Sequence, residues 1–438
     1  MQIHVFQSYQ GDCLLVEDDT GQNRILSDGG TPEAMRDTIA TALSNWHEAN
    51  KPIDLAYISH IDSDHIGGVA VLLDLAVQWK VFDFHHANAD PSPQPALPRP
   101  PEIKALWHNA FRDLIKDNSG EIENLLAASA LMLQASNDKA LVDIGYEHAQ
   151  IATSIKQALT VSRLIKPDLL DIELNRLPSN PEHSGKLLMA RPNQSAAEFG
   201  TLRATILCPT SAELEGLRKG WNNWLRSEAN RQTARRIRDQ YAGQLEAGAT
   251  SLAIRTFELF GWEGVPDYKH VTAPNVASTV LFIEEGSKTL LLTGDNHPDM
   301  ILKGLEDAGL IGDGYIHLDV LKYPHHGSEH NISDTFPLIV SADHYLFCGD
   351  GSNTNPELSV LDQMLAARVG PAKKRARAPV AENRPFKFWF STSPKVQEAG
   401  EKRDHMLRVQ EWAERKQRQH SDLFSFHFST QPFTTVSA

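Results

Sequence analysis

The chain has 438 residues, of which 41% are hydrophobic and 22% are charged, and its formal net charge is −14. This composition is typical of a globular protein that buries a core, and it excludes a disordered or fibrous chain. The acidic balance argues against a surface that coats nucleic acid broadly, although it leaves a local binding groove open.

No apolar run reaches the roughly 18–20 residues that a membrane span needs. The first residues lack the basic start and apolar core of a secretory signal. Cys13, Cys208 and Cys348 are far apart and odd in number, so they predict neither a disulfide framework nor a paired metal site. We therefore expect a cytoplasmic protein without a membrane span.

The first predicted elements are strands joined by turns. Residues 2–8 carry alternating apolar positions, residues 13–16 form a short apolar run, and residues 24–26 lead into Asp28 and two glycines. A helix is predicted after Thr31, which stands before a proline and can cap it. The next predicted strand covers residues 53–59.

The densest group of potential metal ligands stands where the strand at 53–59 gives way to a predicted helix at 69–76. The group consists of His60, Asp62, Asp64 and His65. A loop after a strand can turn several side chains toward one point, whereas a helix spreads them around its circumference. The pattern therefore favours a metal site over incidental histidines in an acidic loop, and mixed imidazole and carboxylate ligands suit zinc, manganese or iron.

The composition changes after a strand predicted near residues 81–84, which is followed by His85 and His86. Residues 90–101 are rich in proline and predict a linker. The helical pattern of residues 102–174 indicates an inserted subdomain, which we expect beside the site, where it would set substrate choice. A strand at 202–207 then ends at Cys208.

Two later strand ends repeat the arrangement of the first. The strands at 278–283 and 289–293 form a predicted hairpin, and the second of them leads to Asp295 and, two residues later, His297. The strand at 318–323 leads to the pair His325 and His326. Strand ends that deliver ligands to one edge of a sheet can build a rigid metal site, so we expect these groups to share one site. The last elements predicted are strands at 345–348 and 423–428 and helices at 358–367 and 406–417.

These blocks resemble, in the same order, the metallo-β-lactamase superfamily. The closer resemblance is to the hydrolase domain of the ComEC competence proteins and their soluble relatives. The blocks that carry it are Gln10-Gly11-Asp12, Ser27-Asp28-Gly29-Gly30, the H-x-D-x-D-H-x-G-G run at 60–68, Asn275 with Ser278, Leu292-Thr293-Gly294-Asp295 and the L-K-x-P-H-H-G-S run at 321–328. They cover residues 1–85 and 202–365.

The resemblance implies an α/β protein built as an αββα sandwich, with a helical insertion and a site for two divalent metal ions. Zinc is the preferred metal, and manganese is the second choice. The implied organisation has four parts: a first half of the metallo-hydrolase domain at 1–89, a proline-rich linker and helical insertion at 90–200, a second half at 201–368, and a C-terminal extension at 369–438.

The resemblance also assigns roles to the ligands. Asp64, His65 and His326 would hold one ion, His60 and Asp62 would hold the other, and Asp295 would bridge both; Asp64, Asp295 and His326 would be the catalytic residues. His326 is preferred to His325 because the last ligand of the superfamily usually stands directly before the glycine. Asp28 would orient a ligand or the loop.

The sequence departs from the superfamily pattern at one metal position. Asp62 stands where many members have histidine, as it does in ComEC-like members, and the distal histidine has no counterpart at residues 207–210. Cys208, His85 and His86 are the candidate replacements, although a buried strand cysteine and plain loop histidines explain them equally well. We expect this position to bind its ion more weakly.

The resemblance implies a metal-dependent hydrolase in which a metal-bound hydroxide attacks a phosphodiester, as in a nuclease. His297 or the unused histidine of the pair would protonate the leaving oxygen. Basic side chains could follow a phosphate backbone, although a solvated helix face and loop explain them as well: Arg226, Arg231, Arg235, Arg236, Arg238 and residues 373–377.

Two alternatives remain open. One is a hydrolase of small-molecule esters, thioesters or lactones, with the insertion closing over the pocket. The other is a degenerate, metal-stabilised scaffold that binds a protein partner in a multi-component system. The superfamily hosts several chemistries, so the resemblance alone does not choose among them.

Overall fold

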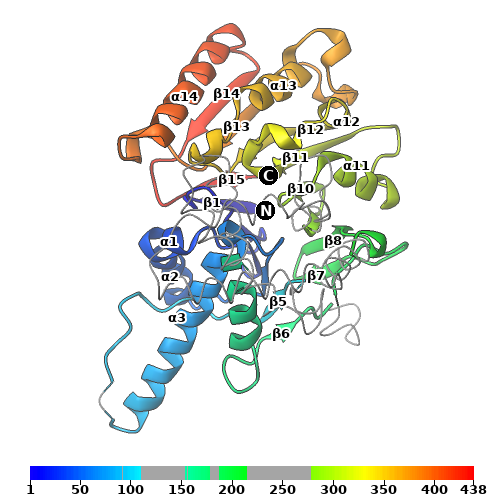
Figure 1. Cartoon of the computed structure of the whole chain (residues 1–438). Coiled ribbons are helices and arrows are strands. Elements are labelled where there is room, and N and C mark those ends of the chain that lie inside the picture. Colours follow the sequence, from blue (N-terminus) through cyan, green and yellow to red (C-terminus); the bar gives the residue numbers. More distant parts are fainter. Residues whose placement is uncertain (91, 110–152, 155, 178–186, 215–277) are drawn as a thin grey trace, which may run out of the picture.

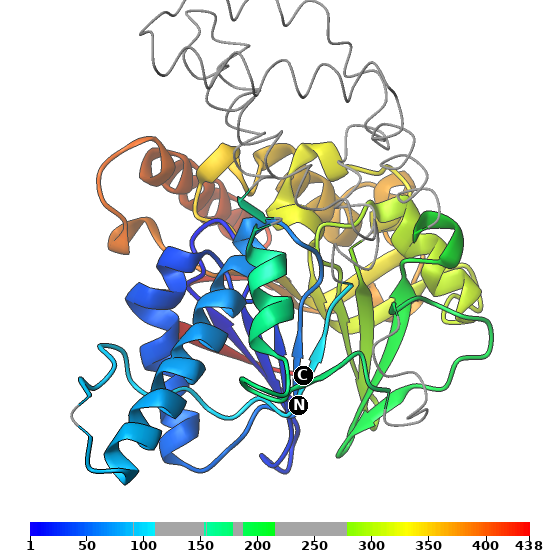
Figure 2. The ribbon, with the colours of Figure 1, turned by 60° about the horizontal axis from the view of Figure 1, so that its bottom comes forward.

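The computed structural model describes residues 1–90, 92–109, 153–154, 156–177, 187–214 and 278–438. In this part of the chain two β-sheets lie face to face, and helices cover the outer face of each (Figure 1, Figure 2). The expected α/β class and αββα arrangement are therefore confirmed.

The first sheet has seven strands in the order β15-β1-β2-β3-β4-β5-β6. Strands β3 to β6 are parallel to one another, whereas β1 is antiparallel to both of its neighbours. The strands are β1 (Gln2–Phe6), β2 (Leu14–Glu17), β3 (Arg24–Ser27), β4 (Leu55–Tyr57), β5 (Ala105–Trp107), β6 (Glu173–Leu174) and β15 (Phe433–Ser437).

The second sheet has eight strands in the order β14-β13-β12-β11-β10-β9-β8-β7. Strands β10 to β14 are parallel, and β7 to β10 pair antiparallel. The strands are β7 (Ala197–Phe199), β8 (Leu202–Cys208), β9 (Val280–Glu285), β10 (Lys288–Leu292), β11 (Ile316–Lys322), β12 (Val340–Phe347), β13 (Phe386–Phe390) and β14 (Phe424–Phe428).

The helices fall into two outer layers. Beside the first sheet are α1 (Pro32–Ala34), the π-helical turn η1 (Met35–Ile39), α2 (Ala40–Glu48) and α3 (Ser63–Ala87). Beside the second sheet are α11 (Pro298–Asp307), α12 (Phe336–Ile339), α13 (Leu358–Val369) and α14 (Glu401–Gln419). The 3-10 turns are η4 (Pro324–Gly327), η5 (Glu329–Asn331), η6 (Ser352–Thr354), η7 (Ala372–Lys374), η8 (Pro379–Ala381) and η9 (Pro394–Val396).

Three apolar layers hold the sandwich together. Side chains alternate between the two faces of a strand, so each strand feeds both a helix-facing layer and the layer between the sheets. In β2, Leu15 packs toward the helices while Leu14 and Val16 pack between the sheets. In β10, Leu291 packs toward the helices and Leu290 toward the opposite sheet. Because both faces are covered, the strands are apolar at nearly every position.

The helix α3 is longer than the sequence predicts. It runs from Ser63 to Ala87, so the strand expected at residues 81–84 is wrong. The apolar run there does not alternate as a strand would, and no turn residues bound it. The helix that begins in the buried first half of α3 therefore continues through this run. By length and composition α3 could cross a membrane, with a mean hydropathy of 1.3, but 56% of that window is buried inside the protein.

The last seventy residues take part in both sheets. Strands β13 and β14 extend the second sheet, α14 covers it, and β15 pairs with β1 at the edge of the first sheet. Figure 1 shows β15 beside the blue N-terminal strand β1, and β13, β14 and α14, coloured orange to red, at the top of the view. This segment, suggested above as an extension, therefore contributes to the sandwich itself.

The segment expected as a helical insertion is partly strand. Strands β5 and β6 continue the first sheet and β7 begins the second. Each has only two or three residues, too few for a strand pattern to be visible in the sequence. Residues 110–152 and 155, in the middle of the predicted subdomain, lie outside the described residues. Close to them, Gln157 Nε2 donates to Ser63 Oγ over 2.9 Å, beside the start of α3.

Candidate metal centre

The loop between β4 and α3 carries the first group of predicted ligands. His60 and Asp62 lie in the loop, and Asp64 and His65 lie in the first turn of α3. His60 and His65 are buried, with 5% and 0% of their surface exposed. Two glycines allow neighbouring turns to pack against this loop: a Cβ on Gly11 would lie 1.8 Å from the Asp64 carbonyl oxygen, and one on Gly68 would lie 1.9 Å from that of Gly29.

A buried carboxylate orients His65. Its Nδ1 lies 3.1 Å from Asp28 Oδ2, while Asp28 Oδ1 accepts a 2.8 Å hydrogen bond from the backbone N–H of Ser59. Asp28 adopts φ +57°, a left-handed conformation that aspartate tolerates better than most residues. The expectation that Asp28 would orient a ligand agrees with this geometry, because the contact leaves Nε2 of His65 facing away from Asp28.

The turn after β11 positions the two histidines of the second half. His325 and His326 have φ values of 47° and 54°, and Gly327 has φ 89°. Consecutive left-handed residues other than glycine are strained by about 1–3 kcal/mol each, and such strain concentrates at functional sites. His326 Nδ1 lies 3.0 Å from Asp12 Oδ1, and His325 Nδ1 lies 2.7 Å from Asn331 Oδ1.

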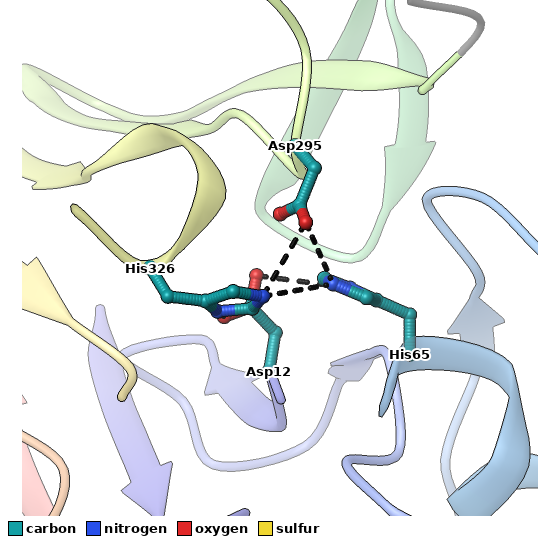
Figure 3. A group of neighbouring side chains, drawn as sticks. All are labelled: Asp12, His65, Asp295 and His326. Carbon is teal, nitrogen blue, oxygen red and sulfur yellow. Dashed lines mark hydrogen bonds and ion pairs between the residues drawn. The ribbon is translucent and has the colours of Figure 1, made fainter. Parts of the chain in front are cut away.

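Three ligand atoms converge on one point, as Figure 3 shows, from the first turn of α3, the loop after β10 and the turn after β11. His65 Nε2, His326 Nε2 and Asp295 Oδ2 are each 3.3 Å from the other two. Tetrahedral ligands about 2.0–2.1 Å from a zinc ion would be about 3.3–3.4 Å from one another. Because both Nδ1 atoms are already bound to carboxylates, the two Nε2 lone pairs face each other and Asp295, which fits a cation between them.

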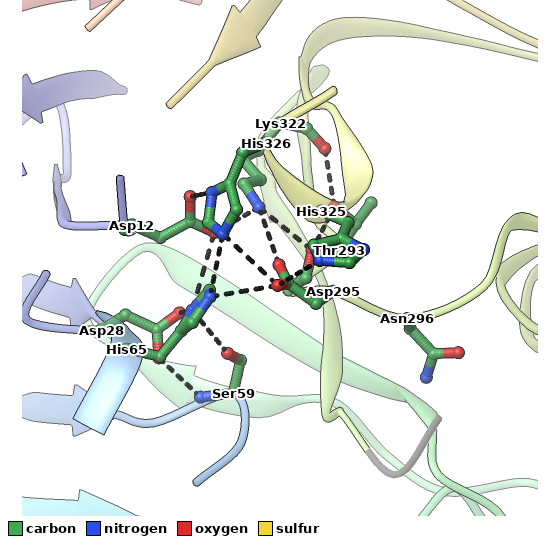
Figure 4. Close-up of polar contacts among 12 residues, drawn as sticks. Asp12, Asp28, Ser59, His65, Thr293, Asp295, Asn296, Lys322, His325 and His326 are labelled. Atoms are coloured by element: carbon green, nitrogen blue, oxygen red, sulfur yellow. Dashed lines mark hydrogen bonds and ion pairs between the residues drawn. The ribbon is translucent and has the colours of Figure 1, made fainter. Parts of the chain in front are cut away.

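Asp64 completes this first position better than Asp12 does. Asp12, His65, Asp295 and His326 carry potential ligand atoms within 4.8 Å of one another. The Asp12 carboxylate, however, already contacts the buried Lys322 ammonium as well as His326 Nδ1, so it acts as an orienting group (Figure 4). Asp64 Oδ2 lies 3.4 Å from His326 Nε2, on the open side of the cluster.

The charges in this cluster compensate one another. Burial alone would lower the pKa of His65, but the Asp295, Asp28 and Asp64 carboxylates outweigh it and raise the pKa well above its usual value. The pKa of His326 is raised in the same way. Burial alone would raise the pKa of Asp295, but the surrounding histidines hold it well below its usual range. A divalent cation can therefore replace protons in this cluster.

His60 and Asp62 define a second, less complete position. His60 Nε2 lies 3.5 Å from Asp62 Oδ2 and 4.0 Å from Asp295 Oδ2. This buried nitrogen has no hydrogen-bond partner among the described residues. Asp295 turns Oδ2 toward both positions, and its other oxygen faces the Lys322 ammonium at 3.7 Å. The residues thus fit the bridging arrangement, with one carboxylate oxygen shared.

The family comparison bears on the part of the chain that holds the first ligand group. Residues 8–122 match the family model of the metallo-β-lactamase superfamily. Most members of that superfamily are metal-dependent hydrolases, and the whole second sheet lies outside the match. No curated protein matches the chain.

The candidate metal site does not include every predicted candidate. Cys208 packs in the core between the second sheet and α11, where its thiol contacts the Met300 carbonyl over 3.4 Å. His85 and His86 lie in the last turn of α3, and His85 pairs with Asp90. The structure therefore contradicts all three as replacements for the distal histidine, since strand Cys208 faces the helices and the predicted strand before His85 is helix.

Two further predicted groups have defined places. His297 caps the N-terminus of α11, accepting a 3.2 Å hydrogen bond from the Asp299 N–H. His325 is partly exposed, and its Nε2 lies 3.7 Å from Asp295 Oδ2. Asn275 and Arg226 to Arg238 lie outside the described residues.

Two residues of the site carried no role in the sequence analysis. Asp12 and Lys322 belong to two of the sequence blocks that carry the resemblance, and those blocks were the signal that could have found them. Nothing in the sequence indicates that the two side chains contact each other. Their contact, together with a 3.0 Å hydrogen bond from Lys322 Nζ to the Gly294 carbonyl, ties the first sheet to the second below the ligands.

The two metal positions should release their ions at different chelator concentrations. Carboxylates anchor the rings of His65 and His326, whereas His60 Nδ1 contacts only the Ser59 hydroxyl, 3.0 Å away, and such anchoring strengthens metal binding about 10–100-fold. We expect graded chelation to remove one ion first, with loss of activity, and manganese to restore it better than zinc. His60→Ala should lose the weak ion and His65→Ala the tight one, as measured by elemental analysis. Two sites of equal affinity would contradict this prediction.

Metal should stabilise the protein more at pH 8 than at pH 6. In the metal-free protein the folded-state pKa values of His65 and His326 lie above the unfolded value of about 6.5. Their protonated rings therefore stabilise the metal-free fold fully below that pH, and this contribution is lost as the pH rises through the raised values. Metal needs the neutral rings. Thermal denaturation with and without zinc at both pH values tests this, and an equal Tm shift would refute it.

Proposed function

We propose that this chain is a metal-dependent hydrolase of phosphodiester bonds, with single-stranded DNA or another nucleotide-containing substrate as the first class to test. One observation carries the proposal. His65 Nε2, His326 Nε2 and Asp295 Oδ2 lie 3.3 Å from one another, and a buried carboxylate holds the far nitrogen of each ring. Ordering of this kind supports an active metal site over a degenerate scaffold.

The chain's own residues would prepare the site. Asp28 and Asp12 fix the two rings, and Lys322 neutralises Asp12 so that the ring contact costs less. When bound, divalent ions supply Lewis acidity, which brings the pKa of water toward neutrality and offsets charge on the attacking and leaving oxygens of a phosphodiester.

His325 is the better candidate for the proton donor to the leaving oxygen. It faces Asp295 with Nε2 and is fixed by Asn331 through Nδ1. Its side chain is 24% exposed, so a substrate can reach it. His297 is 3% exposed, and its Nδ1 caps α11, which leaves it a helix-capping role.

The phosphodiester preference rests on the resemblance to ComEC-like hydrolases, which we propose as the subgroup of this chain. Asp62 in place of an imidazole also supports this preference, because a carboxylate-rich position suits the hard ions used with phosphate substrates. Function within a fold is decided by the site, so the assay must be broad.

The test uses the full chain loaded with zinc or manganese. Bis-p-nitrophenyl phosphate and labelled single-stranded DNA, duplex DNA and RNA are compared with a thioester, a lactone and a β-lactam. We expect turnover of the phosphodiesters, lost in His326→Ala and kept in His85→Ala, the matched change of a surface histidine. His325→Gln should keep both ions and lose rate more strongly for poor leaving groups.

The alternatives predict other outcomes. Turnover of a lactone or thioester alone, with binding insensitive to salt, would establish the small-molecule hydrolase instead, because phosphate contacts weaken steeply with salt. Full metal loading without turnover of any substrate would favour the scaffold that binds a protein partner.

A further inference from the structure

The imidazole of His108 is buried and has no partner for either nitrogen among the described residues. It is 1% exposed, and both Nδ1 and Nε2 are shielded from solvent without a hydrogen bond. Leaving one buried polar group unsatisfied costs about 1–3 kcal/mol, and native proteins rarely do so without an ion, a water or a ligand at the group. The ring therefore needs a partner that the described residues do not provide.

The sheet places His108 at the same edge as the predicted ligands. Strands β4 and β5 are parallel, with Tyr57 opposite Trp107, and the backbone N–H of Ile58 donates to the Trp107 carbonyl over 2.9 Å. His108 follows β5 directly and His60 stands three residues after the end of β4, so both lie beyond neighbouring carboxyl ends at one edge of the sheet.

The backbone around His108 is fixed. Its N–H donates to Asn175 Oδ1 over 2.7 Å, and its carbonyl accepts from Asn175 Nδ2 over 2.8 Å. The side chain of Asn109 makes the same pair of contacts with the backbone of Leu188. The side chains of Asn175 and Asn109 thus fix the backbone at the end of β5 with hydrogen bonds like those between paired strands. A ring carried on such a rigid element is prearranged, which is a requirement for a metal ligand.

The second metal position lacks a nitrogen ligand of this kind. His60, Asp62 and the shared Asp295 supply three ligands, and the buried His60 Nε2 is also unpartnered. The side chains first considered for the vacancy point elsewhere, since Cys208 faces the helices and His85 lies at the far end of α3. We propose that His108 is the fourth ligand of this position and stands in for the distal histidine. The inference rests on the proposed metal site.

The test measures metal rather than turnover. His108→Met replaces the ring with an apolar side chain of similar volume, and His108→Ala is the second variant if the first packs poorly. Full-length protein is equilibrated with Zn²⁺ or Co²⁺ against graded chelator. We expect wild type and His85→Ala to bind two ions, and both His108 variants to keep the tight ion while losing at least about 100-fold in affinity for the other. The visible spectrum of the Co²⁺ protein should lose the part that belongs to the second ion.

Metal-free His108→Met should be at least as stable as wild type, because the change removes two unsatisfied nitrogens. Two ions bound by His108→Met with wild-type affinity and spectrum would overturn the inference, and so would a wild-type protein that saturates at one ion. If wild type binds two ions and His108→Met binds one, while no phosphodiester is cleaved, the inference stands and the proposed substrate class falls.

Discussion

Replacing Asp295 with asparagine should abolish hydrolysis and disturb both metal positions while leaving the fold intact. Asp295 Oδ2 lies 3.3 Å from Nε2 of both His65 and His326, and 4.0 Å from that of His60. The amide keeps the shape of the side chain but removes the charge that both ions would share. Changes to groups that only orient ligands cost about 10–100-fold, so a shared ligand should cost more than 100-fold in kcat.

Elemental analysis and kcat measured on the same preparation test this expectation. Asp307→Asn is the matched control, because Asp307 is an exposed carboxylate on α11 that pairs with Lys303 at the surface. The control should match wild type in both measurements. An Asp295→Asn protein with two ions and a normal rate would remove Asp295 from the site.

Replacing Lys322 with methionine should destabilise the protein by about 3–5 kcal/mol, which is the usual cost of leaving a buried charge without its partner. The Lys322 ammonium is 1% exposed and contacts the Asp12 carboxylate. Burial would lower the pKa of Lys322, but Asp12 and Asp295 raise it above its usual value, so the pair is ionised in the folded protein. The methionine leaves the Asp12 carboxylate buried without the ammonium, with the rings of His326 and His65 beside it.

Urea denaturation of the metal-free protein gives the free energy of unfolding for this comparison. The double variant Asp12→Asn with Lys322→Met should recover much of the loss, because it removes both charges together. Lys303→Met, on the exposed face of α11, should change stability by less than about 0.5 kcal/mol. If Lys322→Met also lowered the free energy of unfolding by less than about 0.5 kcal/mol, the buried pair of Asp12 and Lys322 would contribute little to stability.

Much of the site could be predicted because its ligands cluster in the sequence. The group from His60 to His65 stands after β4, and Asp295 and His326 stand after β10 and β11, as the apolar runs and turn residues indicate. Strand ends are local features, since a few consecutive side chains and a glycine set them. Because the carboxyl ends of parallel strands lie at the same edge of a sheet, parallel pairing brings these strand ends together.

The strand predicted at residues 81–84 was wrong because the sequence signal there was local and short. A short apolar run is ambiguous between strand and helix, and here the buried first half of α3 decides the matter. The three-residue strands β5 and β7 exist only because long-range pairing extends the sheets, so local pattern did not reveal them.

The sequence by itself determined the α/β class, the strand ends that carry His65, Asp295 and His326, and the mixed ligand chemistry. Only the tertiary structure paired Asp12 with Lys322 and His326, joined β15 to β1, and set His108 beside the loop of His60. The physical reason is distance along the chain. Local conformation depends on neighbours that the sequence displays, whereas the partner of a buried charge or an unpaired imidazole is chosen by how the two sheets pack, and residues hundreds of positions apart meet only then.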